Sequence, residues 1–118
     1  MSAHHPSLAA GRWHGFSLVE QLAHVGSEVE RALNWRAKGN EELCRRALER
    51  GLELLALTIA DPKHRGRLRE LTRLREVLLD YFLGENEYGS SATSWHRYFH
   101  PFALASLDPA DRPGASIR

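Results

Sequence analysis

Residues 40–62 read NEELCRRALERGLELLALTIADP, and this segment indicates the class of the fold. Its hydrophobic residues cover nearly half of a helical wheel, so a helix formed here must be buried on more than one flank. Asn40 can cap the first turn, and the pair Asp61-Pro62 ends the helix. Gly51 falls within the apolar face, where the missing side chain lets a neighbouring helix or aromatic ring come close. We therefore predict a central helix here.

One further helix is predicted before this segment and another after it. Ser17 and Glu20 have the spacing of a capping box, and Gly39 marks the end of the helix that begins there. The helix after the central one follows a short connection, residues 62–66, and ends at Gly84. Each has one apolar stripe, made of Leu18, Leu22, Val25, Val29 and Leu33 in the first and of Leu68, Leu71, Leu74, Leu78 and Phe82 in the third.

A fourth helix is predicted after Ser90 or Ser91, either of which can cap it. Its aromatic side is formed by Trp95, Phe99 and Phe102. Pro101 has no amide hydrogen, so we expect it to kink the helix or divide it near His100.

The predicted fold is an all-α, four-helix, up-down-up-down bundle over residues 17–106, because no segment alternates apolar and polar residues at strand spacing. Residues 1–16 are expected to form a flexible arm, and residues 107–118 a flexible tail. The chain has 118 residues, of which 42% are hydrophobic and 26% charged, with 16 Lys+Arg against 15 Asp+Glu. These values exclude a multidomain enzyme and a disordered or strongly basic chain.

Cysteine content and hydropathy favour a cytoplasmic protein. Cys44 is the single cysteine, and on the apolar face of the central helix its thiol is expected to act as a small hydrophobe. No apolar run is long enough for a signal peptide or a membrane span, so we expect no membrane association. There is no phosphate-binding loop, dinucleotide fingerprint or nucleophile elbow, and we predict no cofactor.

Basic residues are concentrated in residues 61–75, which contain six Lys or Arg and two Asp or Glu. Three arginines share one ridge of the predicted third helix: Arg65, Arg69 and Arg73. Such a ridge can bind phosphate groups, and the alternative is an exposed face paired with neighbouring glutamates. Arg75 is expected at the edge of the apolar face, where it needs a carboxylate partner, either Glu28 or Glu87.

The loop of residues 84–89 has the most function-like sequence of the chain. Two glycines bracket Glu85, Asn86, Glu87 and Tyr88, and Asp80 lies one turn earlier. This acidic group could bind a cation or a basic partner surface. The alternative is a helix-to-helix turn in which Asn86 caps backbone groups and Tyr88 packs over the end of the bundle.

Two residue pairs have a spacing that suits metal ligands. His96 and His100 are four residues apart, as are Glu20 and His24, so two helices could offer four ligands. However, both histidines of the fourth helix project toward the flank of its aromatic side, and the paired Glu-x-x-His motifs of di-iron bundles are absent. We therefore predict no metal site.

Short motifs occur along residues 17–105: GSE (26–28), WRAKGN (35–40), DYF (80–82), GENEYG (84–89) and SWHRYF (94–99). In these motifs the chain resembles a family of small uncharacterised helical proteins from bacteria and archaea. This resemblance implies no particular activity. The layout of the chain is more distantly similar to the HEPN-type four-helix bundles, which act as RNases or as substrate-binding companions of nucleotidyltransferases. HEPN ribonucleases carry an arginine several residues before a histidine, whereas only two residues separate Arg97 from His100. The resemblance therefore implies the non-enzymatic, partner-binding branch.

The leading prediction is a cytoplasmic interaction module that docks on a protein partner and forms a homodimer, either through the wide face of the central helix or through the aromatic residues of the fourth. One alternative is an HEPN-like subunit that binds RNA or a nucleotide. Another is a weak RNase or metal hydrolase that uses Arg97, His100 and His96. The candidate binding residues are Arg65, Arg69, Arg73, Arg75, Asp80, Asn86, Glu87, Tyr88, Trp95, Arg97 and His100.

Overall fold

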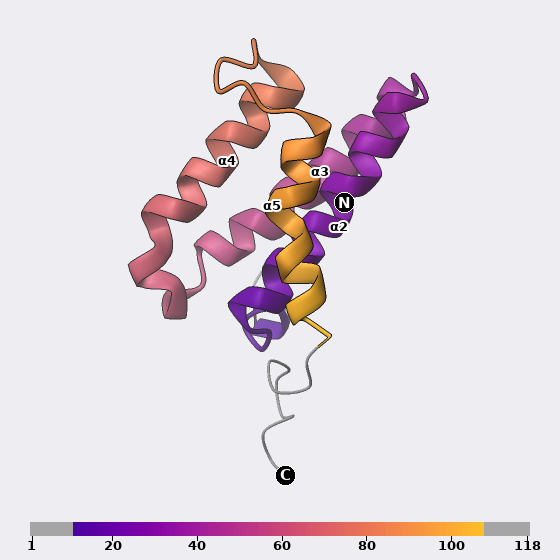
Figure 1. The fold of residues 1–118 in the computed structure, drawn as a ribbon. Helices are drawn as coiled ribbons and strands as arrows, with labels where there is room; N and C mark the ends of the chain where they lie inside the picture. The colour runs from indigo at the N-terminus through magenta and orange to yellow at the C-terminus, as the bar shows by residue number, and fades with distance from the viewer. Residues whose placement is uncertain (1–10, 108–118) are drawn as a thin grey trace.

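The structure, a computed structural model, describes residues 11–107 and is all-helical over them, as the sequence predicts. Its four long helices are α2 (Leu18–Ala37), α3 (Glu41–Ile59), α4 (Leu68–Leu83) and α5 (Ala92–Ala105). A short 3-10 helix, η2 (Pro62–Arg67), joins α3 to α4. Figure 1 shows that the chain direction alternates from each long helix to the next. Most of the predicted arm and tail, residues 1–10 and 108–118, lies outside the described residues.

Three of the four long helices begin at caps that the sequence predicts. The Ser17 hydroxyl accepts a hydrogen bond from the Glu20 amide at 3.1 Å, and the Glu20 carboxylate accepts one from the Ser17 amide at 3.1 Å. The Asn40 side chain accepts from the Leu43 amide at 3.0 Å at the start of α3. Of the two serines considered for α5, Ser91 is the cap, and its hydroxyl accepts from the Ser94 amide at 3.1 Å.

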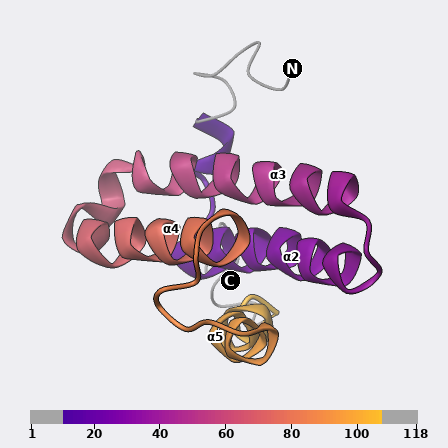
Figure 2. The same cartoon turned by 90° about the horizontal axis from the view of Figure 1, so that it is seen from above.

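The helices are arranged around α2, which packs against α3 on one side and α5 on another. The contacts of α4 are mainly with α3. In Figure 2, α5 is seen nearly end-on, whereas the other three long helices are seen from the side. The axis of α5 is therefore inclined to the other three axes.

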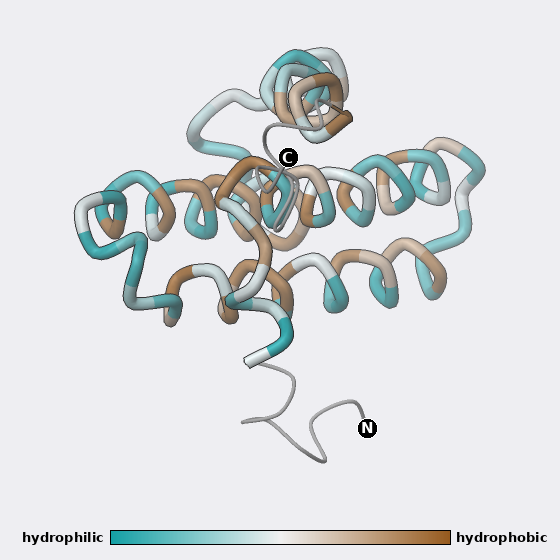
Figure 3. The backbone as a smooth tube through the Cα atoms, turned by 90° about the horizontal axis from the view of Figure 1, so that it is seen from below, coloured by the Kyte–Doolittle hydropathy of each residue, from teal (hydrophilic) through white to brown (hydrophobic). Residues whose placement is uncertain are grey.

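The core follows the predicted apolar stripes. Figure 3 shows hydrophobic positions recurring along each helix between hydrophilic ones, which is the pattern of helices with one buried face. The main buried cluster consists of Leu22, Val25, Val29, Leu33, Leu55, Leu71, Leu74, Leu78, Trp95 and Phe99. Leu68 departs from the prediction with a 40% exposed surface, because α4 begins at this residue and its first turn is not covered by a neighbour.

The structure does not divide the fourth helix at Pro101. α5 is one helix that contains Pro101 in its interior. Pro101 and Arg97 are both exposed, so water can bind the Arg97 carbonyl that lacks its usual amide donor four residues later. Trp95 and Phe99 are buried inside the chain, so they are not available as a surface for a second copy.

Among the helices of residues 11–107, none combines the length and the apolar composition needed to cross a membrane.

Candidate functional site

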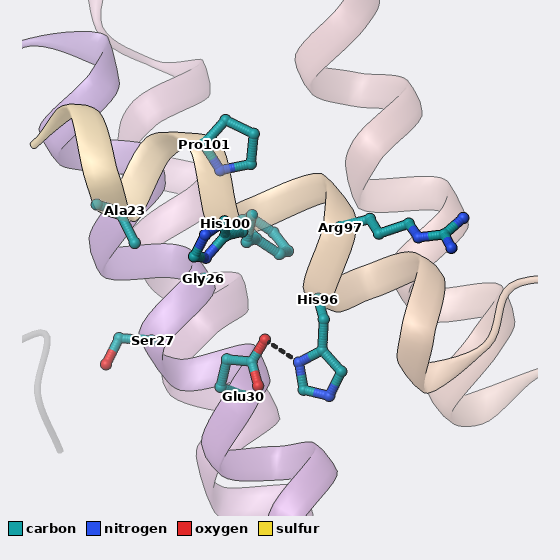
Figure 4. Close-up of a pocket in the computed structure, with 10 residues that line it drawn as sticks. Ala23, Gly26, Ser27, Glu30, His96, Arg97, His100 and Pro101 are labelled. Atoms are coloured by element: carbon teal, nitrogen blue, oxygen red, sulfur yellow. Dashed lines mark hydrogen bonds and ion pairs between the residues drawn. The ribbon is translucent and has the colours of Figure 1, made fainter.

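A groove of about 740 Å³ runs between α2 and α5 (Figure 4). Its α2 wall is formed by small residues, Ala23, Gly26 and Ser27, followed by Glu30 one turn later. Its α5 wall is formed by His96, Arg97, Phe99, His100, Pro101 and Ala103. Phe99 lies directly on Gly26, where a side chain on α2 would have no room. This contact brings the two helices close together and leaves the groove beside them.

The charges of the groove are divided unequally between the two helices. Glu30 is its one carboxylate, and the Oε2 atom of Glu30 lies 2.5 Å from Nδ1 of His96 (Figure 4). His100 and Arg97 form no ion pair with any residue between 11 and 107. Figure 4 shows His100 directed toward α2 and Arg97 directed away from it, at the outer edge of the groove. The groove therefore has an apolar floor, one carboxylate that is hydrogen-bonded to a histidine, and two basic side chains without acidic partners.

The four residues considered as metal ligands are not brought together. Glu20 closes the capping box of α2, and the ring of His24 packs 5.3 Å from the ring of Phe16. His96 is paired with Glu30. Across the described residues, no three His, Cys, Asp or Glu side chains form a group that could hold a metal ion.

The arginines of residues 61–75 do not form the predicted helical ridge. Arg65 lies in η2, before α4 begins, and the backbone of His64 in the same segment is non-helical, so the helical wheel does not extend back to Arg65. Arg69 is exposed, and Arg73 has a 3.7 Å contact with Glu76. The three arginines do not share one helical face, because the segment that contains Arg65 is a 3-10 helix and not an earlier turn of α4.

The prediction that Arg75 is buried with a carboxylate partner is wrong. Arg75 is exposed and has no ion pair among the described residues. Glu28 instead binds Arg31 at 2.9 Å and Arg50 at 3.3 Å. On the helical wheel Arg75 falls at the margin of the buried face of α4. In the structure this margin is open to solvent, because α4 packs mainly against α3.

The loop of residues 84–89 is organised by Asp80. The carboxylate of Asp80 accepts hydrogen bonds from the Glu87 amide at 2.8 Å and from the Tyr88 amide at 3.0 Å. Asn86 adopts a positive φ of 56°, and its side chain exchanges two hydrogen bonds with the backbone of Ser90. Tyr88 is 52% exposed and lies beside Arg73, whose guanidinium carbon is 5.6 Å from the ring centre. The Asn86 hydrogen bonds match the turn alternative, and both Asp80 oxygens are occupied by backbone amides. The expectation that Tyr88 packs over the end of the bundle is wrong, because its side chain is exposed beside Arg73.

A buried polar cluster is the feature that sequence reasoning missed. Gln21 is fully buried and donates to the Trp13 carbonyl at 2.9 Å and to the Asp61 carboxylate at 3.0 Å. The Trp13 indole donates to the Thr58 hydroxyl at 2.9 Å, and His64 lies 2.6 Å from the Gln21 carbonyl oxygen. The cluster thereby joins the segment before α2 to the end of α3. The sign of this cluster in the sequence is that Gln21, a polar residue, occupies a position on the apolar stripe of α2.

The hydrogen bonds of this cluster fix the protonation of His64. Both amide hydrogens of Gln21 are already donated, so its side-chain oxygen accepts and Nε2 of His64 donates to it. Burial lowers the pKa of His64 below 6.5, and the nearby Asp61 carboxylate opposes this shift only in part. The imidazole is therefore neutral at pH 7 and carries its proton on Nε2.

Asp61 is the charged member of the cluster. Burial favours a higher pKa for Asp61, but hydrogen bonds from Lys63 and Gln21 and the charge of Lys63 outweigh it, so the pKa falls from 3.8 to about 2. The Lys63 ammonium lies 2.5 Å from the Asp61 carboxylate and also donates to the His14 carbonyl at 2.8 Å. Asp61 thus serves as a structural anion, with no exposed surface for a ligand.

Cys44 is buried in the second cluster of the core with Ala32, Ala47 and Leu48. Burial raises the pKa of the Cys44 thiol, although the Arg36 guanidinium opposes the shift. The thiol stays protonated at neutral pH and is a poor nucleophile.

The chain matches no protein-family model, no curated protein and no solved structure. The likeness to the HEPN-type bundles therefore stays a prediction.

Proposed function

We propose that this chain is a small cytoplasmic interaction module, a four-helix up-down-up-down unit that docks an acidic, amphipathic helical segment of a protein partner in the α2–α5 groove. The groove itself is the observation that carries the proposal. Its volume is about 740 Å³, and its lining residues extend from 23 to 30 on α2 and from 96 to 103 on α5. The alternating chain direction in Figure 1 supports the up-down-up-down arrangement.

The floor of the groove suits a helix as its occupant. Gly26 is covered by Phe99, but Ala23 and Ser27 beside it present only small side chains on the same face of α2, so a docked helix can come close to α2 there. Recognition of this type places apolar residues of an amphipathic helix at every third or fourth position into the groove.

The charges of the groove favour an acidic partner. Glu30 is hydrogen-bonded to His96, whereas Arg97 at the outer edge has no carboxylate partner among residues 11–107. An acidic flank on the docked segment would pair with Arg97, and such rim charges act mainly on the association rate and its salt dependence.

The test is selection from a displayed library of random peptides, followed by fluorescence anisotropy with the selected sequences. We expect enrichment of acidic, amphipathic helical peptides. Ser27→Trp fills the groove and should abolish binding, whereas Ala56→Trp, at an exposed position of α3 outside the groove, should not change it. Selection of peptides without acidic residues, or unchanged binding to Ser27→Trp, would contradict the proposal.

A second candidate is RNA binding by the exposed arginines of η2 and α4. Arg65, Arg69 and Arg75 are all exposed and have no ion pair in the part of the chain that the structure describes. Binding through them would weaken steeply as salt rises, because phosphate contacts release counterions. The charge reversals Arg69→Glu and Arg75→Glu should then reduce both the affinity and its salt slope. RNA affinity that is independent of salt would exclude this candidate.

A further inference from the structure

α4 carries a stripe of residues that the other described helices leave largely uncovered. Leu68 is 40% exposed and Leu83 is 61% exposed, at the first and the last position of the helix. Between them the stripe continues at spacings of four, three, four and four residues, which place it on one face of the helix. Its members are Leu68, Thr72, Arg75, Leu79 and Leu83, of which Leu79 is half-buried and the other four are exposed. Figure 1 shows α4 at the edge of the molecule, with no other described helix on its outer side.

The stripe is symmetric about its own midpoint. Leu68 and Leu83 lie equally far from a point between residues 75 and 76, and so do Thr72 and Leu79. A second copy of α4 that is laid antiparallel on this face therefore sets Leu68 against Leu83 at both ends of the contact. Symmetric dimers are built in this way, because a two-fold axis uses the same surface patch of both copies.

The charges beside the two ends of the stripe are complementary. Arg69, in the first turn of α4, and Glu87, in the following loop, are both exposed and have no ion pair among residues 11–107. The Glu87 amide donates to the Asp80 carboxylate at 2.8 Å, which holds Glu87 beside the last turn of α4. Arg69 and Asp80 are eleven residues apart, about three helical turns, so they lie on the same flank of the stripe.

A two-fold axis between antiparallel helices brings equal flanks together. The register that sets Leu68 against Leu83 also sets Arg69 of one copy against the last turn of α4 in the other, where Glu87 lies. A basic end then meets an acidic end twice in the same contact, which favours a second copy of the chain over an unrelated partner.

We propose that the α4 stripe is the contact surface of a symmetric, antiparallel homodimer. The leucines at its ends pack across the interface, and Arg69 of each copy pairs with Glu87 of the other. One pair of 16-residue helices with the adjoining loops gives an interface at the small end of the range for specific complexes, so the dimer dissociates on dilution. The α2–α5 groove of each copy stays open, because no residue of α4 lines it.

Sedimentation velocity tests the proposal on the full chain after removal of nucleic acid, at concentrations from about 1 µM to about 1 mM. We expect an equilibrium between monomer and dimer that shifts with concentration. Leu83→Glu should weaken the dimer more than tenfold, because the symmetry brings the substitution into the interface twice. Leu104→Glu is the matched control and should leave the affinity unchanged, since Leu104 is 57% exposed on α5, outside the stripe.

An exchange of charges tests the orientation of the two copies. Arg69→Glu and Glu87→Arg should each weaken the dimer several-fold, because each sets like charges against one another. The double variant Arg69→Glu/Glu87→Arg restores opposite charges across the interface and should recover the affinity of the wild type. Both residues are exposed, so we expect all three variants to fold.

Three results would overturn the proposal: a monomer at every concentration, equal dimer affinities of the Leu83→Glu and Leu104→Glu variants, or a double charge variant that is weaker than either single one. Ser27→Trp, which fills the α2–α5 groove, should leave the dimer unchanged. Leu83→Glu should in turn leave peptide binding in the groove unchanged. Failure of the peptide-docking function and failure of this proposal can therefore be told apart.

Discussion

Gly26 of α2 lies so close to Phe99 of α5 that a Cβ atom at residue 26 would approach Cδ1 of Phe99 to 2.7 Å. Real Cβ atoms essentially never come so near another heavy atom. The absence of a side chain at this residue therefore fixes how closely α5 packs on α2, and with it the width of the groove beside them.

Gly26→Ala should destabilise the protein by about 1–3 kcal/mol. Alanine is favoured over glycine in a helix interior by about 1 kcal/mol, but the contact with the Phe99 ring requires α5 to shift. Urea unfolding followed by circular dichroism measures the change. Gly66→Ala is the matched control, because an added Cβ there meets nothing within 4 Å, and we expect it to be neutral or slightly stabilising. A Gly26→Ala variant as stable as Gly66→Ala would mean that the helices are not in contact there.

Gly51→Leu should destabilise by about 1–3 kcal/mol, because Gly51 is a buried point of contact between α3 and α2. A Cβ at this residue would lie 3.3 Å from Cβ of Glu28, so a whole leucine side chain cannot be accommodated without moving α2. The free energy of unfolding in urea is again the measurement. No change in stability would place this face of α3 in solvent.

The caps and apolar stripes could be predicted from the sequence because they depend on residues within one or two helical turns. Ser17, Glu20 and Asn40 make the expected local hydrogen bonds, and Gly51 lies at the predicted contact. The importance of Gly26 could not be predicted, since it follows from the direction in which α5 returns across α2. The same limit applies to Arg75, whose exposure depends on which side of α4 is covered.

The free energy of unfolding should decrease as the pH is lowered, in two stages that arise from His64 and Asp61 of the buried polar cluster. The pKa of His64 is lower in the folded protein than in the unfolded chain. Below about pH 6.5 the unfolded chain therefore binds a proton at His64 more readily than the folded protein does, and this lowers the free energy of unfolding. The pKa of Asp61 falls from 3.8 to about 2, so its contribution of about 2 kcal/mol is present above pH 4 and lost as the pH falls toward 2. Urea unfolding measured from pH 8 to pH 2 follows both stages.

His64→Gln should remove the stage below pH 6.5, since glutamine can still donate to Gln21 but does not titrate. Asp61→Asn should remove the stage between pH 4 and pH 2 at a cost in stability at pH 7. A pH profile that is the same in the His64→Gln variant and the wild type would show that His64 does not carry the first stage.

Asp80→Ala should destabilise the chain by about 1–2 kcal/mol, because two backbone amides of the 84–89 loop lose their acceptor. Hydrogen exchange at the Glu87 and Tyr88 amides should accelerate, while exchange in the core of α3 follows only the change in global stability. Glu85→Gln is the control, since Glu85 is exposed. Unaltered exchange at Glu87 and Tyr88 would contradict the role assigned to Asp80.

The candidate site was predicted less completely than the fold. Arg97 and His100 were singled out from the sequence, and both line the α2–α5 groove, but they lie there beside Ala23 and Ser27, which carry no chemical signal of their own. The alternatives left open for Asp80 could be decided only once its distances to the loop amides were known. A site made by two helices that are far apart in the sequence depends on their packing, which no local pattern encodes.

The docking of an acidic helical segment in the α2–α5 groove is tested most directly by NMR titration of the ¹⁵N-labelled protein with a selected acidic peptide. We predict that the largest amide shifts occur at Ala23, Ser27, His100 and Ala103, which line the groove. Largest shifts at Arg69 and Arg75 of α4, with the groove amides unchanged, would contradict it.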